Sequence, residues 1–366
     1  MDKKSKKLYT NLLFSSLRGA LLGGEIDVSI YQALKEDEWQ QFYALSAKHG
    51  VLAIIYDVIS QLPTDAQPPR RLKLQWALSA ETIINRARKQ QETINSLAAL
   101  MDSISVPFAV LKGISFASYY PNPLLRECGD CDAYMFGEHT KAEKFLQSKG
   151  INLQKEDYKH SHFTYKGLLV ENHRYCTKVR EGSKALRYEQ EMYRYLYDKN
   201  KRRYISEDSK IILPCDEFNI LMYLRHTSVH FLTEGLTLRH LCDWYMILNK
   251  AAGRVDWGVL MDVLAVQKLG KFATTLTILA DRYLGGNFHT LFNVNCSEWI
   301  EKKVLDDILF GLKPLYSTAR SGMMERVGIV KYSIAHAWKY HHIMHKSVIL
   351  SILNSLYGIV FKRSKI

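Results

Sequence analysis

The stretch LKGISFASYYPNPLLRECGDCDAYMF, residues 111–136, decides which fold the chain is expected to adopt. The apolar run SVPFAV at 105–110 predicts a short buried strand that ends at a Lys-Gly pair. Residues 114–120 predict a helical turn. The proline-bearing loop after it leads to GDCDAYMF at 129–136, which predicts a second strand. Two short strands joined in this way indicate a small α/β core.

Further elements of this core are expected downstream. KAEKFLQSKG at 141–150 predicts a helix that ends at its final glycine. HFTYKGLLVENHRYC at 162–176 has aromatic and β-branched residues on both sides of a glycine, which is typical of a β-hairpin. KIILP at 210–214 is expected to close the sheet.

Helical patterns flank the core on both sides. Apolar residues recur at three- and four-residue intervals in the first hundred residues and again after Pro214, and the loop at 61–71 is the clearest break in the first region. The expected organisation is an N-terminal helical region (1–103), a core (104–214) and a C-terminal helical domain (215–366). A chain of 366 residues is too long for one ordinary compact core. The expected class is α+β, with a small mixed sheet between helical regions.

The composition indicates a folded protein with anionic partners. Hydrophobic residues make up 47% of the chain and charged residues 24%, which argues against extensive disorder. The formal net charge of +13 favours an anionic partner, which would be a nucleotide, a nucleic acid or an acidic membrane surface, without choosing among them.

The basic start MDKKSKKLYT lacks a secretory pattern, so a cytoplasmic protein with reduced cysteines is expected. Cys128 and Cys131 have zinc-ligand spacing, but no second pair completes a zinc site.

The C-terminal stretch VILSILNSLYGIVF at 348–361 is the nearest candidate for a membrane-spanning segment. It is too short to span a bilayer, and basic residues follow it. Two interpretations stay open: a buried terminal helix, and peripheral membrane contact through 348–366.

Asp130 and Asp132 are the candidate metal ligands. They stand two residues apart on a predicted strand, so both side chains project from the same face. Two carboxylates this close repel each other, and a divalent cation relieves the repulsion. Mg²⁺, or Mn²⁺ in its place, suits hard oxygen ligands that are shared with substrate phosphates. The sequence therefore predicts a divalent-metal site at this strand.

The order of these features resembles a known family. A strand, Lys-Gly, a short helix, Tyr-Pro, an arginine and Gly-Asp-x-Asp are similar to the pattern of a poorly characterised family of bacterial nucleotidyltransferases within the DNA polymerase beta-like superfamily. The resemblance is specific over about residues 106–175. It implies a third acidic residue on a neighbouring strand, which VENHRYC supplies as Glu171, with His173 facing the same way. We expect that strand to pair antiparallel with the strand of Asp130 and Asp132.

The resemblance implies a nucleotidyltransferase-type sheet and two-metal transfer of a nucleoside monophosphate from an NTP to an unidentified acceptor. Asp130 and Asp132 would hold Mg²⁺ on the triphosphate. Glu171 would complete the site for a second metal or help to deprotonate the acceptor hydroxyl. Asp130→Asn or Asp132→Asn should then abolish metal-dependent nucleotide binding and leave the stability of the apo protein unchanged or slightly higher. The alternative is a protein of the same fold that binds nucleotide or nucleic acid without turnover.

Lys112, Gly113, Arg126 and His173 are the candidate nucleotide-contacting residues. Well-understood members of the superfamily usually carry Gly-Ser or Gly-Gly after the first strand, whereas Lys112-Gly113-Ile114 stands there in this chain. Lysine offers phosphate a point charge and arginine a bidentate fork, but either would equally serve as a salt-bridge partner of the acidic cluster. Gly113 suits a tight turn or a close approach of ligand. His173 would line the pocket or be structural.

His226 and His230 lie four residues apart, so they share one face of a predicted helix. A metalloprotease would need glutamate where Thr227 stands, which excludes that function. The pair either borders the cleft or is packed within the helical domain, and the second interpretation is favoured because no third ligand is evident. Arg239 and Asp243, also four apart, are expected to form an ion pair within the helix.

Overall fold

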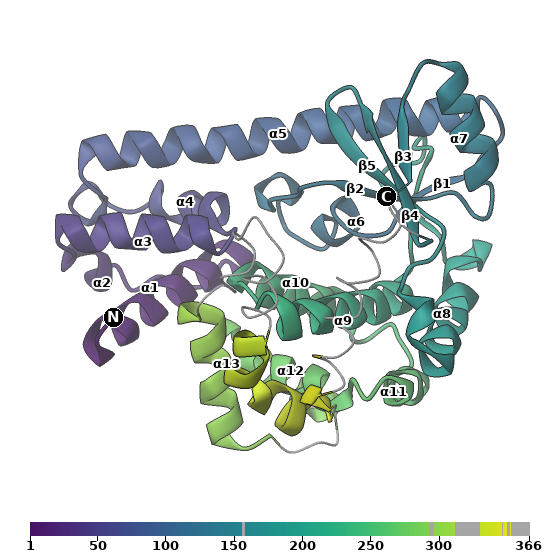
Figure 1. Cartoon of the computed structure of the whole chain (residues 1–366). Helices are drawn as coiled ribbons and strands as arrows, with labels where there is room; N and C mark the ends of the chain where they lie inside the picture. Colours follow the sequence, from purple (N-terminus) through teal and green to yellow (C-terminus); the bar gives the residue numbers. More distant parts are fainter. Residues whose placement is uncertain (156–157, 293–295, 312–329, 346, 350–351, 353–366) are drawn as a thin grey trace.

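The computed structural model places one mixed β-sheet among helices that pack on both of its faces (Figure 1). The seven strands lie in the order β3-β4-β5-β2-β1-β7-β6. The pairs β1–β7 and β2–β5 are parallel, and the other pairs are antiparallel. This confirms the predicted α+β class. The structure describes residues 1–155, 158–292, 296–311, 330–345, 347–349 and 352.

The strands are short, and the helices differ widely in length. The strands are β1 (Phe108–Val110), β2 (Cys131–Tyr134), β3 (Leu153–Lys155), β4 (His160–Tyr165), β5 (Leu168–His173), β6 (Arg203–Tyr204) and β7 (Ile211–Leu213). The helices up to the end of the sheet are α1 (Lys3–Leu22), α2 (Ser29–Gln32), α3 (Glu36–Lys48), α4 (Leu52–Ile59), α5 (Arg70–Asp102), α6 (Ile114–Ala117), α7 (His139–Ser148) and α8 (Ser183–Leu196). Among the described residues, the helices after the sheet include α9 (Asp216–Thr233), α10 (Leu238–Ala251), α11 (Trp257–Val266), α12 (Gly270–Leu284) and α13 (Glu298–Phe310).

The strand alternation divides the sheet into two buried faces. On one face Val110, Ala133 and Val170 pack with residues of α5 and α7. On the other face Ala109 and Tyr134 join the main core, which also takes in α9 and α10. Asp132 has the same parity along β2 as Tyr134, so its side chain lies on the face that α9 and α10 cover. The functional groups are therefore placed between the sheet and the C-terminal helices.

Helix α5 connects the N-terminal helices to the sheet. Its 33 residues make it about 50 Å long, and it runs along one side of the molecule (Figure 1). Near its start Trp76 packs edge-on against Trp39 and Phe42 of α3. Near its end Ile94 and Leu97 pack under the sheet. The final part of the predicted N-terminal region thus forms part of the core beneath the sheet.

The chain after Pro214 is helical wherever the structure describes it in regular form, as the apolar periodicity predicted. Among the described residues, none of the helices combines the length and the apolar character that a membrane crossing requires. The apolar stretch 348–361, for which a buried helix and a membrane-surface anchor were both open, lies almost entirely outside the described residues.

Candidate active site

Three acidic residues lie on or directly before two neighbouring strands. Asp132 lies in β2, Asp130 directly precedes that strand, and Glu171 of β5 is in register with Asp132. The sequence predicted that Glu171 would lie on a strand adjacent to the aspartates, and it does. The predicted antiparallel pairing is wrong, because β5 runs parallel to β2. The chain leaves β2 through α7 and the β3–β4 hairpin, and a long connection of this kind allows it to re-enter the sheet in the same direction.

The Asp132 carboxylate accepts hydrogen bonds from two side chains, those of Lys112 and His173. Because β1 and β2 are antiparallel, the end of β1 lies beside the start of β2, which brings Lys112 to Asp132. The Lys112 Nζ lies 2.7 Å from Asp132 Oδ1, and His173 Nε2 lies 3.0 Å from the same oxygen. Burial by itself would raise the pKa of Asp132, whose exposed fraction is 3%, but Lys112 and His173 outweigh burial and lower it. Asp132 is therefore held as a carboxylate.

Asp130 is in the opposite electrostatic situation. Its side chain is half-buried, and burial together with repulsion from Asp132 raises its pKa, while Lys112 opposes the rise. Glu171 adds to the repulsion. A divalent cation would relieve this excess of negative charge, and the available donors are the hard oxygens that Mg²⁺ and Mn²⁺ prefer. The residues present therefore fit a divalent metal.

His173 links Glu171 to Asp132 through hydrogen bonds. Its ring is 1% exposed, and its Nε2 lies 3.1 Å from Glu171 Oε2 as well as close to Asp132. Hydrogen bonding from His173 lowers the pKa of Glu171 to about 2, against the effect of burial. The other ring nitrogen, Nδ1, lies 3.1 Å from the backbone carbonyl oxygen of Tyr175. His173 is thus held at both ring nitrogens and belongs to the site itself.

The structure alters what is expected of Asp132→Asn. The sequence alone predicted that this variant would leave the stability of the apo protein unchanged or slightly higher. Here it would remove the nearest counter-charge of Lys112, whose side chain is only 14% exposed. We expect its free energy of unfolding to fall by about 1–3 kcal/mol, since a buried donor loses its charged partner. Urea denaturation of the metal-free protein measures this loss. A variant as stable as the wild type would show that Lys112 is satisfied by Asp130 and Glu171 instead.

Gly113 makes the turn between β1 and α6. Its φ of 53° and ψ of −109° lie in a region that residues with a side chain rarely adopt. A Cβ added there would lie 3.7 Å from the carbonyl oxygen of Asp130, so the cost of a side chain would come from the backbone and not from a clash. The turn places Lys112 directly before α6, where the backbone amide of Ser115 donates to the Lys112 carbonyl oxygen at 2.9 Å.

Gly113→Ala is expected to lower the free energy of unfolding by about 1–3 kcal/mol, because alanine is strained in this conformation. Gly129→Ala is the matched control: its φ is not in the left-handed region and its added Cβ meets no atom within 4 Å. That control should change stability by less than about 0.5 kcal/mol. Urea denaturation of the two variants measures the difference. Equal losses would show that the Gly113 turn carries no special strain.

Arg126 binds a different carboxylate from those of the site. Its Nε lies 2.7 Å from Asp243 Oδ1 and its Nη2 lies 2.8 Å from Asp243 Oδ2, in a bidentate pair with α10. Its Nη1 donates to the backbone carbonyl oxygen of Gly113 at 3.3 Å. Of the two roles open for Arg126, the structure shows the salt bridge, although its partner lies outside the acidic cluster. The expected Arg239–Asp243 ion pair gives way to this arrangement, and Arg239 Nη1 donates to the carbonyl oxygen of Glu127 at 3.1 Å.

A cavity of about 100 Å³ lies between the carboxylates and the C-terminal helices. Lys112, Asp130 and Asp132 line it from the core, and His226 and His240 line it from α9 and α10. His226 therefore borders the cleft. The sequence had favoured the other interpretation, packing within the helical domain. Sequence reasoning missed His240, which carries no motif. Burial, aided by nearby cations, lowers the pKa of His240 to about 3 and the pKa of His226 well below its usual value, so both imidazoles are neutral.

A larger cavity of about 580 Å³ adjoins the first one. It is bounded by α5, α6, the loop at 122–124 and the residues around β6, and it shares Arg126 and Cys128 with the smaller cavity. Its lining is largely apolar and includes Ile114 and Leu124. A volume of this size is in the range of small-molecule pockets.

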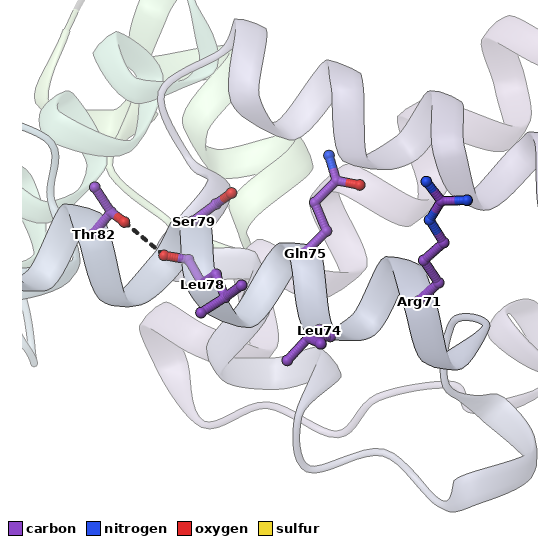
Figure 2. A pocket seen from close by; sticks show the side chains of 6 residues that line it. All are labelled: Arg71, Leu74, Gln75, Leu78, Ser79 and Thr82. Atoms are coloured by element: carbon purple, nitrogen blue, oxygen red, sulfur yellow. Dashed lines mark hydrogen bonds between the residues drawn. The ribbon is translucent and has the colours of Figure 1, made fainter.

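A separate hollow of about 350 Å³ lies on the outer side of α5 (Figure 2). Its lining residues are Arg71, Leu74, Gln75, Leu78, Ser79 and Thr82. Leu74 and Leu78 are exposed, and the hydroxyl of Thr82 is used within the helix, where it donates to the Leu78 carbonyl oxygen at 2.7 Å. The lining offers no carboxylate for a metal, so the carboxylates on β2 and β5 remain the candidate active site.

Comparison with known proteins agrees with this geometry. A family model described as "Uncharacterised nucleotidyltransferase" matches residues 35–285. This match covers more than half of the chain, from the start of α3 to the end of α12. Among curated proteins the comparison finds no match. Among solved structures it likewise finds none. Because the family model covers the sheet, the three carboxylates and the helices that close the cavity, the chain belongs to the uncharacterised nucleotidyltransferase family.

Proposed function

We propose that this protein transfers a nucleoside monophosphate from an NTP to an acceptor at the site formed by Asp130, Asp132 and Glu171. The observation that carries the proposal is the register of β2 and β5, which aligns Glu171 with Asp132 on the face where Asp130 also lies. Membership of a nucleotidyltransferase family supports the general class of reaction. The acceptor is a group with a hydroxyl or phosphate oxygen.

Asp130, Asp132 and Glu171 would hold Mg²⁺ or Mn²⁺. When bound, the metal supplies charge neutralisation for the attacking and leaving oxygens of phosphoryl transfer. The repulsion that raises the pKa of Asp130 is the feature of this chain that favours a cation there. The Lys112 ammonium lies on the cavity wall and supplies a further positive charge next to the triphosphate.

Glu171 and the cavity histidines would act on the substrates directly. Glu171 is only partly buried and is hydrogen-bonded to His173, which supports a role in accepting a proton from the acceptor hydroxyl besides its role in holding metal. His226 and His240 are neutral, so they can donate hydrogen bonds to phosphate oxygens without adding charge. The neighbouring cavity of about 580 Å³ has the size and apolar lining to hold the nucleoside.

A second candidate function is nucleotide or nucleic-acid binding without turnover. The observation that favours it is that the charge of Asp132 is already balanced within the protein, because its Oδ1 accepts hydrogen bonds from both Lys112 and His173. The net charge of +13 would attract a polyanion regardless of chemistry. This function requires no displacement of Lys112 from Asp132.

Pyrophosphate release separates the two functions. The full-length protein is incubated with each of the four NTPs and Mg²⁺ or Mn²⁺, and pyrophosphate and label incorporated into the protein itself are measured. The proposed transferase releases pyrophosphate in a metal-dependent way with at least one NTP. Nucleotide binding without any pyrophosphate, across all NTPs and both metals and with hydroxyl acceptors added, would favour the binding function instead.

A further inference from the structure

The β4–β5 hairpin gathers imidazoles on the face of the sheet that bears Asp132. His160 is in register with His173, and His162 is in register with Glu171. The rings of His160 and His162 stack at 4.6 Å between centroids, and those of His160 and His173 lie 5.1 Å apart. The alternation of the strands places all four side chains on one face. The proposed transfer reaction uses only Glu171 and His173 of this group.

Three of these side chains have the composition of a metal site. A ligand atom of His160, one of Glu171 and one of His173 all lie within 4.8 Å of one another. Ligands at about 2.0–2.2 Å from a shared metal lie about 3–4 Å apart, so small side-chain adjustments would bring the three to that distance. The closest pair, His173 Nε2 and Glu171 Oε2, is already 3.1 Å apart.

The hydrogen bonds of His173 add an independent argument. The backbone carbonyl of Tyr175 can only accept a hydrogen bond, so His173 Nδ1, 3.1 Å away, carries a proton. Nε2, the other ring nitrogen, faces the oxygens of Glu171 and Asp132 at 3.1 and 3.0 Å. A metal ion bound here would take the place of the Nε2 proton that these carboxylates accept. Metal-bound histidines characteristically donate their other N–H to a backbone carbonyl, as His173 does.

We propose that His160, Glu171 and His173 form a position for a divalent transition metal ion, of the kind that binds imidazole nitrogen. Two imidazoles and one carboxylate suit zinc, cobalt, nickel or iron, whereas Mg²⁺ prefers oxygen ligands alone. This position differs from the oxygen site of Asp130, Asp132 and Glu171 in its two imidazole ligands, and the two sites share Glu171. The inference goes beyond the proposed transfer reaction and holds whether or not nucleotide is turned over.

Cobalt binding tests the proposal without reference to activity. The full-length protein is treated with a chelator, dialysed and titrated with Co²⁺ alone, and the visible absorption of the bound ion is followed. We expect saturable binding that about a hundredfold excess of Mg²⁺ does not displace, because Mg²⁺ competes poorly for nitrogen. His160→Gln should weaken Co²⁺ binding at least tenfold, since even loss of a supporting group behind a ligand costs about 10–100-fold.

Two matched variants locate the site. His162→Gln removes an imidazole from the same strand and face but lies outside the group of three, so Co²⁺ affinity should be kept. Asp130→Asn should also keep Co²⁺ affinity, although it is expected to lose metal-dependent nucleotide binding. The two proposals can therefore fail separately: loss of Co²⁺ binding with intact transfer removes only this one.

The proposal is overturned if the wild-type protein does not bind Co²⁺, or if Asp130→Asn loses Co²⁺ while His160→Gln keeps it. Should His160→Gln fail to fold, as circular dichroism would show, pulsed electron paramagnetic resonance of the wild-type protein with Cu²⁺, which readily takes imidazole ligands, decides. Coupling to imidazole nitrogen supports the proposal. Coordination by oxygen alone means that His173 bridges the carboxylates as an imidazolium and that no metal binds at the histidines.

Discussion

Asp130→Asn is expected to lower NTP-dependent pyrophosphate release by about a thousandfold or more while the protein stays folded. A metal ligand contributes several kcal/mol to phosphoryl transfer, and each 1.36 kcal/mol corresponds to about tenfold in rate. Stability should be unchanged or slightly higher, because the substitution removes a charge that Asp132 and Glu171 repel. Asp130→Asn is a sharper test of the site than Asp132→Asn, because the loss of Asp132 also leaves Lys112 without its nearest charged partner.

The measurements are pyrophosphate release at saturating NTP and metal, and urea denaturation of the metal-free protein. Glu138→Gln is the matched control, since it removes one exposed carboxylate beyond the opposite end of β2. It should keep full activity. Undiminished pyrophosphate release in Asp130→Asn would remove this residue from the metal site, and unfolding of the variant would make its role structural.

Asp243→Asn is expected to lower the free energy of unfolding by about 3–5 kcal/mol, the usual cost of breaking a buried ion pair by removing one partner. Arg126, only 6% exposed, would lose the carboxylate that accepts both its Nε and its Nη2. Tyr120 would lose the charged acceptor of its hydroxyl, which now lies 2.7 Å from Asp243 Oδ1. The loop before β2 would thereby lose its charged contacts with α10 and keep the hydrogen bond from Arg239 to the Glu127 carbonyl oxygen.

Urea denaturation, read as the shift in midpoint at unchanged slope, measures this loss. Glu191→Gln provides the comparison, because it breaks the exposed pair with Arg194 and should cost less than about 1 kcal/mol. Replacing both partners, as Arg126→Met with Asp243→Leu, should recover much of the lost stability, since no buried charge then remains unpaired. A cost below about 1 kcal/mol for Asp243→Asn alone would contradict the view that this pair attaches the loop to α10.

The sequence by itself determined the local elements that carry the site. The apolar run before Lys112, the glycine of the hairpin and the spacing of Asp130 and Asp132 predict β1, β2 and the β4–β5 hairpin, all of which are present. Such signals are readable because they depend on neighbours along the chain. A two-residue period sets which face a side chain takes, and glycine in the middle of an aromatic and β-branched run marks a turn.

The tertiary structure alone decided which elements face one another. Arg126 pairs with Asp243, 117 residues away, where the four-residue spacing pointed to Arg239. The parallel direction of β5 follows from the path of the chain through α7, β3 and β4, and this path also brings His160 beside His173. The physical reason is that local patterns set the face of a side chain but not its neighbours across the sheet. Those neighbours depend on strand order and on which buried charges meet, and both are properties of the whole packed chain.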